Sequence, residues 1–420
     1  MIRDSVSRRD VLQALSAAMI AVPTVVGSAR SARAAGPIQM ISHRYPALEY
    51  FAEKMRTAVP GVTVNTQLMP FDKALELSTI ALSSKSDTVD IMYVNDSTFL
   101  TFVKNGWLRP LDDFWANYKD QFGLGDFAEA VVKTYTYNGH IYVMPHTLNV
   151  MLFFYRKDLF DQASKQPPKT FAEYRELAKS FNGPARAGTI NCLKPVDASL
   201  CETHWYMNTI GDGWFDDNWK PKFNDTRGVA AIEMLKEITR YAQQGFAAAA
   251  DDECMIALQQ DAASMGLQWA TRAKAMDDPT KSRVVNKIGW VAPPQGHARV
   301  SSSGYAISAF SKQDPDAMFR VLATSASESS IRGAASMMVP PRKALLADSE
   351  LRSANRYYPA ALASLDTSVP FPRLAEFYSV GEFITRRILQ AVSGEMTVKA
   401  ALDEAAAETE SFLKGHGYYQ

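Results

Sequence analysis

The sequence lacks any excess of charge of one sign. Its 45 lysines and arginines are balanced by 45 aspartates and glutamates. Proteins that bind nucleic acid or anionic membranes through surface charge carry a basic excess, which is missing here. No apolar run after residue 34 is long enough to span a bilayer, which takes about 20 residues. We therefore expect neither a nucleic-acid-binding protein nor a membrane-spanning one.

Cysteine is also scarce. The three cysteines are Cys192, Cys201 and Cys254, and no two of them form a C-x-x-C pair. The spacing therefore signals neither a redox pair nor a thiolate metal site. Cys192 and Cys201 are close enough in sequence to close a short loop in an oxidising compartment, so we predict a disulfide between them. Cys254 is then expected to be a small buried apolar residue.

Residues 1–34 have the pattern of an export signal. Arg8 and Arg9 directly precede an apolar stretch, and the small residues that follow it end in an A-x-A sequence at 32–34. Signal peptidase cleaves after such a sequence, and paired arginines are typical of twin-arginine (Tat) export. A membrane anchor is the alternative, but Pro23 and the shortness of the apolar stretch disfavour it.

Strand-like and helical patterns alternate at the start of the remaining chain. Strand-like runs at 38–42, 62–64 and 89–94 are separated by apolar residues at helical spacing, with a helix predicted at 71–82. This order is typical of an α/β domain with a mostly parallel sheet. The Asn138-Gly139 pair tolerates positive φ and suits a hairpin turn. Beyond it we predict an extended run at 141–154, helices at 171–180, 226–243 and 398–413, and strands at 263–267, 288–291 and 305–308.

Seven segments occur in the order and spacing of a known family. They lie at 105–112 (NGWLRPLD), 137–145 (YNGHIYVMP), 154–160 (FYRKDLF), 167–171 (PPKTF), 262–269 (AASMGLQW), 303–308 (SGYAIS) and 369–373 (VPFPR). In these segments the chain resembles the bacterial solute-binding proteins of the maltose-binding type, often called extracellular solute-binding family 1. The resemblance extends over essentially the whole chain after the export signal.

The resemblance implies a two-lobed α/β fold, the type II-like periplasmic-binding-protein fold, with the ligand in a cleft between the lobes. Residues 35–147 and 305–345 would form the N-terminal lobe, and 148–304 and 346–420 the C-terminal lobe. Extended crossings near 145–149 and 300–304 would act as hinges. The implied function is that of the substrate-binding component of an ABC importer. A monomer in the periplasm would capture a sugar or polyol and deliver it to the permease transmembrane subunits, with no cofactor and no catalytic residues.

Candidate ligand-binding residues are polar or aromatic residues where strands end at the cleft. Aromatic rings stack on the C–H faces of a sugar, whereas amides, carboxylates and guanidinium groups bind its hydroxyls. The candidates are His43, Arg44, Tyr45, Asn95, Asp96, His146, Asn149, Trp205, Trp214, Trp269, Gly304, Arg373 and Tyr378.

Several of these candidates have alternative roles. In the resemblance, Asp96 matches a hydroxyl-binding aspartate and Trp269 a stacking aromatic, whereas Asn149 replaces an acidic group common in relatives. A helix cap is the alternative role of Asp96. One of Trp205 and Trp214 is expected to stack and the other to pack. Gly304 either permits close approach of the backbone to a ligand or simply forms part of a turn.

Two other functions compete with that of a solute receptor. A secreted carbohydrate-active hydrolase is one, because carboxylates are plentiful, but the G-x-S-x-G, H-E-x-x-H and P-loop motifs are absent. A ferric-ion receptor of the same general fold is the other, because Tyr357 and Tyr358 form an adjacent pair of phenols. Pro359 and the helical pattern around this pair favour packing instead.

Overall fold

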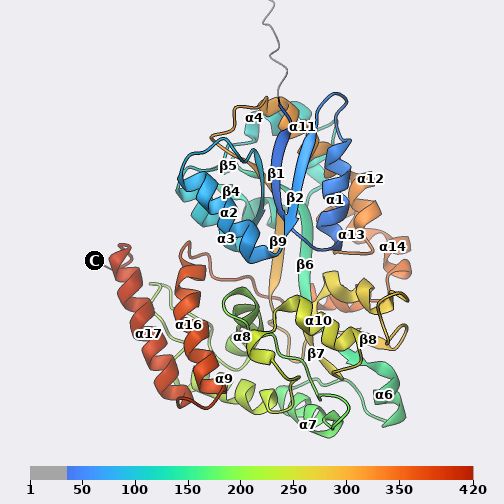
Figure 1. The fold of residues 1–420 in the computed structure, drawn as a ribbon, viewed down its shortest axis with the longest axis vertical. Coiled ribbons are helices and arrows are strands. Elements are labelled where there is room, and N and C mark those ends of the chain that lie inside the picture. The colour runs from blue at the N-terminus through green and yellow to red at the C-terminus, as the bar shows by residue number, and fades with distance from the viewer. Residues whose placement is uncertain (1–35, 420) are drawn as a thin grey trace, which may run out of the picture. The chain divides into compact units, whose positions relative to one another are not determined.

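A mixed β-sheet organises the protein, whose computed structural model describes residues 36–419. The predicted export signal at 1–34 lies outside these residues. The strand order is β2-β1-β3-β9-β6-β7, and β8 also pairs with β6 (Figure 1). The strands are β1 Ile38–His43, β2 Val64–Met69, β3 Ile91–Asn95, β6 Val143–Arg156, β7 Met265–Trp269, β8 Ile288–Val291 and β9 Val300–Ile307.

The parallel part of the sheet lies at one end. β1 pairs in parallel with β2 and with β3, as the alternation of strands and helices predicts. Apolar residues at helical spacing bury the inner face of the first helix against this sheet, among them Leu48, Phe51 and Met55. The Asn138-Gly139 hairpin is also confirmed, because both residues have positive φ. They join the short antiparallel strands β4 Thr136–Tyr137 and β5 His140–Ile141.

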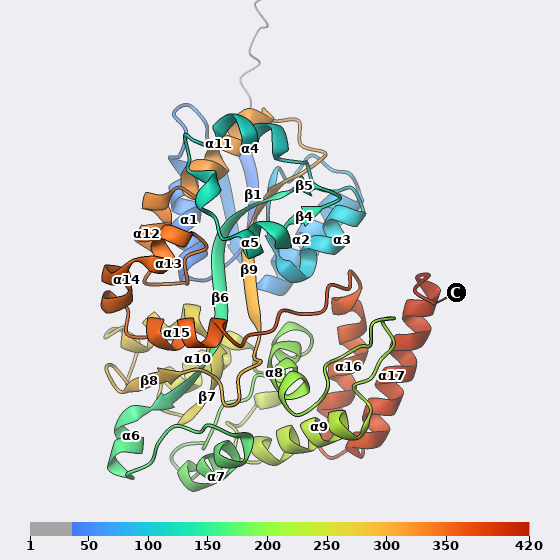
Figure 2. The same ribbon diagram turned by 180° about the vertical axis from the view of Figure 1, so that it is seen from behind.

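Strand β6 connects the two ends of the sheet. Its first half, as far as Val150, pairs antiparallel with β9, and its second half, from Met151, pairs with β7 and β8. The long strands β6 and β9 lie side by side and link the elements around β1 with those around β7 (Figures 1 and 2). Helix α15 packs across β6, as Figure 2 shows from behind.

Helices cover the sheet in two groups. α1, α11 and α12 pack together beside the parallel strands, and α8, α9, α16 and α17 pack together at the other end. The helices are α1 Pro46–Arg56, α2 Phe71–Ser83, α3 Asp96–Lys104, α4 Asp112–Tyr118, α5 Glu129–Thr134, α6 Lys157–Gln162, α7 Phe171–Phe181, α8 Asp197–Thr209, α9 Thr226–Thr239, α10 Asp251–Gln259, α11 Pro315–Ser325, α12 Glu328–Ala334, α13 Lys343–Ala347, α14 Ser349–Ala354, α15 Tyr358–Leu365, α16 Phe377–Val392 and α17 Val398–Gly415. Short 3-10 helices occupy Leu124–Asp126, Phe246–Ala248 and Ala270–Asp277. Within residues 36–419, no helix combines the length and apolar character needed to cross a membrane.

The predicted disulfide between Cys192 and Cys201 is wrong, because the structure pairs Cys192 with a different cysteine. Cys192 is bonded to Cys254, across 62 residues of sequence, and Cys201 is a free, buried thiol. Cys201 lies inside α8, where its sulfur is 2.9 Å from Nη1 of Arg299. The extended chain at Cys192 instead runs beside α10, with Cα atoms of the two bonded cysteines 6.2 Å apart. Tertiary packing, not nearness in sequence, selects the pair.

Candidate functional site

A small polar cavity of about 50 Å³ lies beside the paired strands β6 and β9, which connect the elements around β1 with those around β7. Carboxylates, guanidinium groups, hydroxyls and aromatic rings meet in it. Its lining residues are His43, Tyr45, Phe71, Tyr93, Asn95, Thr147, Asn149, Asp197, Asp251, Trp269, Thr271, Arg272, Arg299, Ser301 and Ser303.

The register of the sheet brings these residues together. Asn149 of β6 lies opposite Ser301 of β9, and Thr147 lies opposite Ser303. Ser303 in turn lies opposite Asn95 at the end of β3. Because side chains alternate along a strand, these residues share one face of the sheet. β1, β3 and β7 contribute residues at their ends, and α8 and α10 contribute their first residues, Asp197 and Asp251.

Arg299 is the central cation of the site, and its side chain is almost fully buried. Its two terminal nitrogens lie 3.3 Å from a carboxylate oxygen of Asp96 and of Asp197, respectively. It also donates to Ser97 Oγ at 2.6 Å, and its guanidinium carbon lies 3.7 Å from the ring centroid of Phe371. Arg299 therefore joins α3 to α8 across the cavity.

Arg272 is a second buried cation of the lining. It forms an ion pair of 2.9 Å with Asp252 and lies over the ring of Tyr45, 5.6 Å from its centroid. Next to this pair, burial and then the negative charge of Asp197 raise the pKa of Asp251 to about 7. Acidic and basic side chains thus compensate one another within the cavity.

Three buried polar atoms of the lining have no hydrogen-bond partner among residues 36–419. They are Oδ1 of Asn149, Nε of Arg272 and Nε of Arg299. Buried polar groups are almost always paired, and an unpaired one costs about 1–3 kcal/mol. One acceptor and two donors without partners therefore belong to residues that line the cavity.

Aromatic side chains form the apolar part of the lining. His43 packs edge-on against Tyr45, Phe71 and Tyr93, with ring centroids 5.1, 5.6 and 5.7 Å away. Burial lowers the pKa of His43 to about 3, so the imidazole is neutral at neutral pH. Trp269, at the end of β7, presents its indole from the other side with 6% of its surface exposed.

Seven of the predicted residues lie at or next to this cavity. His43, Tyr45, Asn95, Asn149 and Trp269 line it. Asp96 and Tyr378 bind residues of the lining: Asp96 pairs with Arg299, and the Tyr378 hydroxyl donates to Asp197. The cap of α3 is Asn95, whose side chain accepts from the Thr98 amide at 3.0 Å. Asp96 is therefore not the capping residue.

The structure does not bring the other predicted residues to this cavity. His146 is buried between the Met144 carbonyl and the Ser325 hydroxyl, 2.9 and 2.8 Å away. The indole nitrogens of Trp205 and Trp214 donate within the core, to Pro294 O and His204 Nδ1. Arg44 is exposed to solvent.

Gly304 and Arg373 have other positions. At Gly304, a Cβ atom would come within 2.0 Å of the Met144 carbonyl oxygen, so this glycine permits close approach of β6 to β9. Gly304 therefore makes room for the backbone of strand β6. It neither contacts a ligand in this way nor forms a turn. Arg373 lines a neighbouring cavity of about 280 Å³, which also contains Asp96.

Sequence reasoning missed both arginines and most of the acids at the cavity. Asp197 and Asp251 each begin a helix, and Ser301 and Ser303 alternate along a strand, so helix-start and period-two patterns offered a signal for these four. Arg272 and Arg299 lie outside the strands, and no local pattern distinguishes them from surface arginines.

The adjacent tyrosines have a packing role. The Tyr357 hydroxyl donates to the Met338 carbonyl at 3.0 Å, and the Tyr358 hydroxyl donates to the Ala335 carbonyl at 2.9 Å. Both rings are buried and stack on each other. Their phenol oxygens are committed to backbone groups instead of converging on a metal site.

Comparisons with known proteins agree with the predicted fold. A sequence profile described as bacterial extracellular solute-binding protein matches residues 42–328. The mannitol-binding protein of Pseudomonas aeruginosa is 22% identical over 369 residues, which are 81% of this chain and 84% of that protein.

Solved structures show the same fold. An ABC-transporter solute-binding protein from Agrobacterium radiobacter K84, in complex with ribitol, has a TM-score of 0.81 and 22% identity, covering 90% of this chain and 98% of that one. Another from Agrobacterium vitis S4, with bound D-mannitol, has a TM-score of 0.82 and 21% identity, covering 92% and 100%. The predicted two-lobed α/β fold is therefore confirmed.

Proposed function

Because the chain belongs to the bacterial extracellular solute-binding proteins, we propose that it captures a sugar or polyol for an ABC importer. Its family and its structural neighbours are binding proteins. The observation that carries the proposal is the cavity itself, whose lining combines aromatic rings with buried polar atoms that have no partner in the described part of the chain, residues 36–419. A polyol offers C–H surface to the rings and hydroxyls that both donate and accept to the polar atoms.

The charges of the cavity favour an uncharged solute. Arg299 is paired with Asp96 and Asp197, and Arg272 with Asp252. A charged solute would have to compete with the pairs of the buried Arg299, and breaking a buried pair by removing one partner costs about 3–5 kcal/mol. A neutral polyhydroxy compound can bind while all of them persist.

The proposed mechanism is closure of two lobes on the solute. The lobes are residues 35–147 with 305–345, and 148–304 with 346–420. Strands β6 and β9 pass between them, and their extended segments near 145–149 and 300–304, which pair with each other, would act as the hinges. Contacts with both lobes would shift the population towards the closed form that the permease subunits bind. We further infer a monomer exported to the periplasm by a Tat-type signal at 1–34.

A solute panel tests this proposal. The purified protein is melted alone and with ribitol, D-mannitol, D-tagatose and maltose, and a solute that binds raises the melting temperature by mass action. We expect at least one polyol or monosaccharide to stabilise the protein. Failure of all four to shift the melting temperature or to give heat in calorimetry would contradict the proposal.

A matched pair of tryptophan variants tests the site. Trp269 and Trp115 are similarly buried, at 6% and 9% exposure, but only Trp269 lines the cavity. Each change to alanine is expected to destabilise the fold, by up to about 3–5 kcal/mol. Trp269→Ala should in addition weaken binding by about 2 kcal/mol, roughly thirtyfold, whereas Trp115→Ala should keep wild-type affinity. Equal affinities in the two variants would remove Trp269 from the site.

A further inference from the structure

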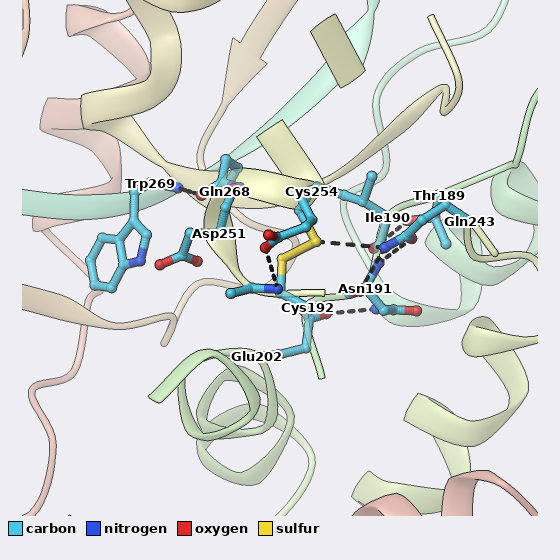
Figure 3. The surroundings of a disulfide bond; sticks show 12 residues. Thr189, Ile190, Asn191, Cys192, Glu202, Gln243, Asp251, Cys254, Gln268 and Trp269 are labelled. Carbon is cyan, nitrogen blue, oxygen red and sulfur yellow. Dashed lines mark hydrogen bonds between the residues drawn. A yellow bond between two sulfur atoms is a disulfide. The ribbon is translucent and has the colours of Figure 1, made fainter. Parts of the chain in front are cut away.

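The disulfide lies one helical turn from a carboxylate of the cavity. Cys254 and Asp251 both belong to the first turn of α10, three residues apart and so on the same side of the helix. Cys254 is fully buried and bonded to Cys192, while Asp251 lines the cavity. Figure 3 shows the Asp251 carboxyl group pointing away from the sulfurs and towards the indole of Trp269.

The other cysteine of the disulfide, Cys192, is close in sequence to a second carboxylate of the cavity. Cys192 lies five residues before Asp197, the first residue of α8, which also lines the cavity. The disulfide therefore joins the two segments that present Asp197 and Asp251. Both acids line the same small cavity, where like charges repel each other, and the charge of Asp197 adds to burial in raising the pKa of Asp251. Repulsion favours separation of the two segments, and the covalent bond opposes it.

A side-chain link extends this support to the aromatic wall. Nε2 of the buried Gln268 donates to the Asp251 carbonyl at 2.9 Å, and its Oε1 accepts from the Trp269 amide at 2.8 Å (Figure 3). The start of α10 is thus tied to Trp269 on one side and to Cys192 on the other. Any displacement of α10 moves Asp251 relative to the indole.

We propose that the Cys192–Cys254 disulfide is a positioning element of the ligand site, which holds Asp251 against Asp197 and Trp269 so that all three contact one solute. The proposal rests on the proposed function of this cavity. Loss of the disulfide should lower stability, but backbone hydrogen bonds also join the same segments, so the protein without it is expected to fold. The amides of Leu193 and Lys194 donate to Phe246 O and Ala249 O at 3.1 and 3.0 Å.

A double-mutant cycle tests the proposal. Cys192 and Cys254 are both changed to serine, Asp251→Asn is made alone, and the three changes are combined. Affinity is measured by calorimetry with whichever of ribitol, D-mannitol, D-tagatose and maltose the wild type binds. We expect the serine variant to fold and to bind at least about tenfold more weakly, and Asp251→Asn to lose a similar factor, as loss of one charged hydrogen bond does. The combined variant should bind no more weakly than Asp251→Asn, because both changes remove one contact.

Two results would overturn the proposal. One is a serine variant with wild-type affinity, and the other is a combined variant whose losses multiply. Trp115→Ala is the control for stability, since it should lower the melting temperature without weakening binding.

A ligand-free measurement separates this proposal from the proposed function. Hydrogen exchange of the α10 amides should be faster in the serine variant than in the wild type, while that of α17 should be unchanged. If α10 exchanges at the same rate in both, the disulfide does not position it. That outcome overturns the inference even if none of the four solutes binds.

Discussion

Replacing Glu202 by glutamine should remove a large part of the pH dependence of stability. Glu202 lies inside α8 with 1% of its surface exposed. One of its oxygens accepts from Nδ2 of Asn191 at 2.8 Å, and the other has no hydrogen-bond partner among the described residues. Burial raises the pKa of this carboxyl from 4.5 to about 8, against the opposing hydrogen bond from Asn191. The folded protein therefore keeps Glu202 mostly protonated at neutral pH.

The sign and size of the effect follow from proton linkage. Between pH 4.5 and pH 8 the folded state binds the proton of Glu202 and the unfolded state releases it. The free energy of unfolding must then fall as the pH rises through this window, and the contribution is lost above the folded pKa. A shift from 4.5 to about 8 corresponds to about 5 kcal/mol at 1.36 kcal/mol per pKa unit, of which about 4 kcal/mol is lost between pH 5 and pH 9. Glutamine does not titrate, so the Glu202→Gln variant lacks this decline.

Denaturant unfolding at pH 5 and pH 9 measures the effect. The loss of unfolding free energy between the two pH values should be smaller in Glu202→Gln than in the wild type, by about 4 kcal/mol. Comparing the two pH-dependent losses cancels any change in hydrogen bonding that does not depend on pH. It also cancels the titration of Asp251, which is present in both proteins. Glu233→Gln, an exposed position on α9, is the control and should follow the wild type. Parallel pH profiles for the Glu202→Gln variant and the wild type would refute the reasoning.

Two further predictions concern the cysteines and export. Thiol titration of the denatured, unreduced protein should find one free thiol, from Cys201, and peptide mapping should recover Cys192 linked to Cys254; three free thiols would contradict the disulfide. Changing Arg8 and Arg9 together to lysine should retain the precursor in the cytoplasm, because twin-arginine export requires the arginine pair. Normal periplasmic yield of that variant would indicate the general secretory route.

The sequence pattern correctly located the residues of the site that lie at the ends of strands. His43 and Asn95 end two adjacent parallel strands, and the carboxyl ends of parallel strands meet at one edge of a sheet, where α/β proteins bind ligands. Trp269 ends a strand of the other group. Such positions are set by secondary structure and the direction of the chain, both of which periodicity and turn residues indicate well.

The side chains of β6 that point into the cavity could not be predicted in the same way. His146 and Asn149 were chosen as polar residues of one crossing, yet only Asn149 lines the cavity. Side chains alternate along a strand, and a register shift between Pro145 and Thr147 places Thr147 and Asn149 on the cavity face. His146 consequently faces α11 and the Ser325 hydroxyl. A strand whose two faces are both buried gives no hydrophobic alternation from which this could be read.

Charged residues in loops were the least predictable. Arg299 immediately precedes β9, and its role arises only when α3 and α8 come near it from residues about 200 and 100 positions earlier. The same holds for the disulfide, whose partners are 62 residues apart. Contacts of this range depend on the complete fold, because no property of the segment around Arg299 differs from that of a solvent-exposed loop.

Discrimination among solutes should follow from the atoms that the protein leaves unpaired. Oδ1 of Asn149 and the Nε atoms of Arg272 and Arg299 are buried in residues of the cavity lining and have no hydrogen-bond partner within residues 36–419. A solute with suitably placed hydroxyls removes these penalties, of about 1–3 kcal/mol each, whereas an apolar solute of the same size retains them. Sites of this kind reject an analogue that lacks one hydroxyl far more strongly than one that lacks a methylene. Because the arginines already hold Asp96, Asp197 and Asp252, the number and placement of hydroxyl groups, more than charge, should set affinity.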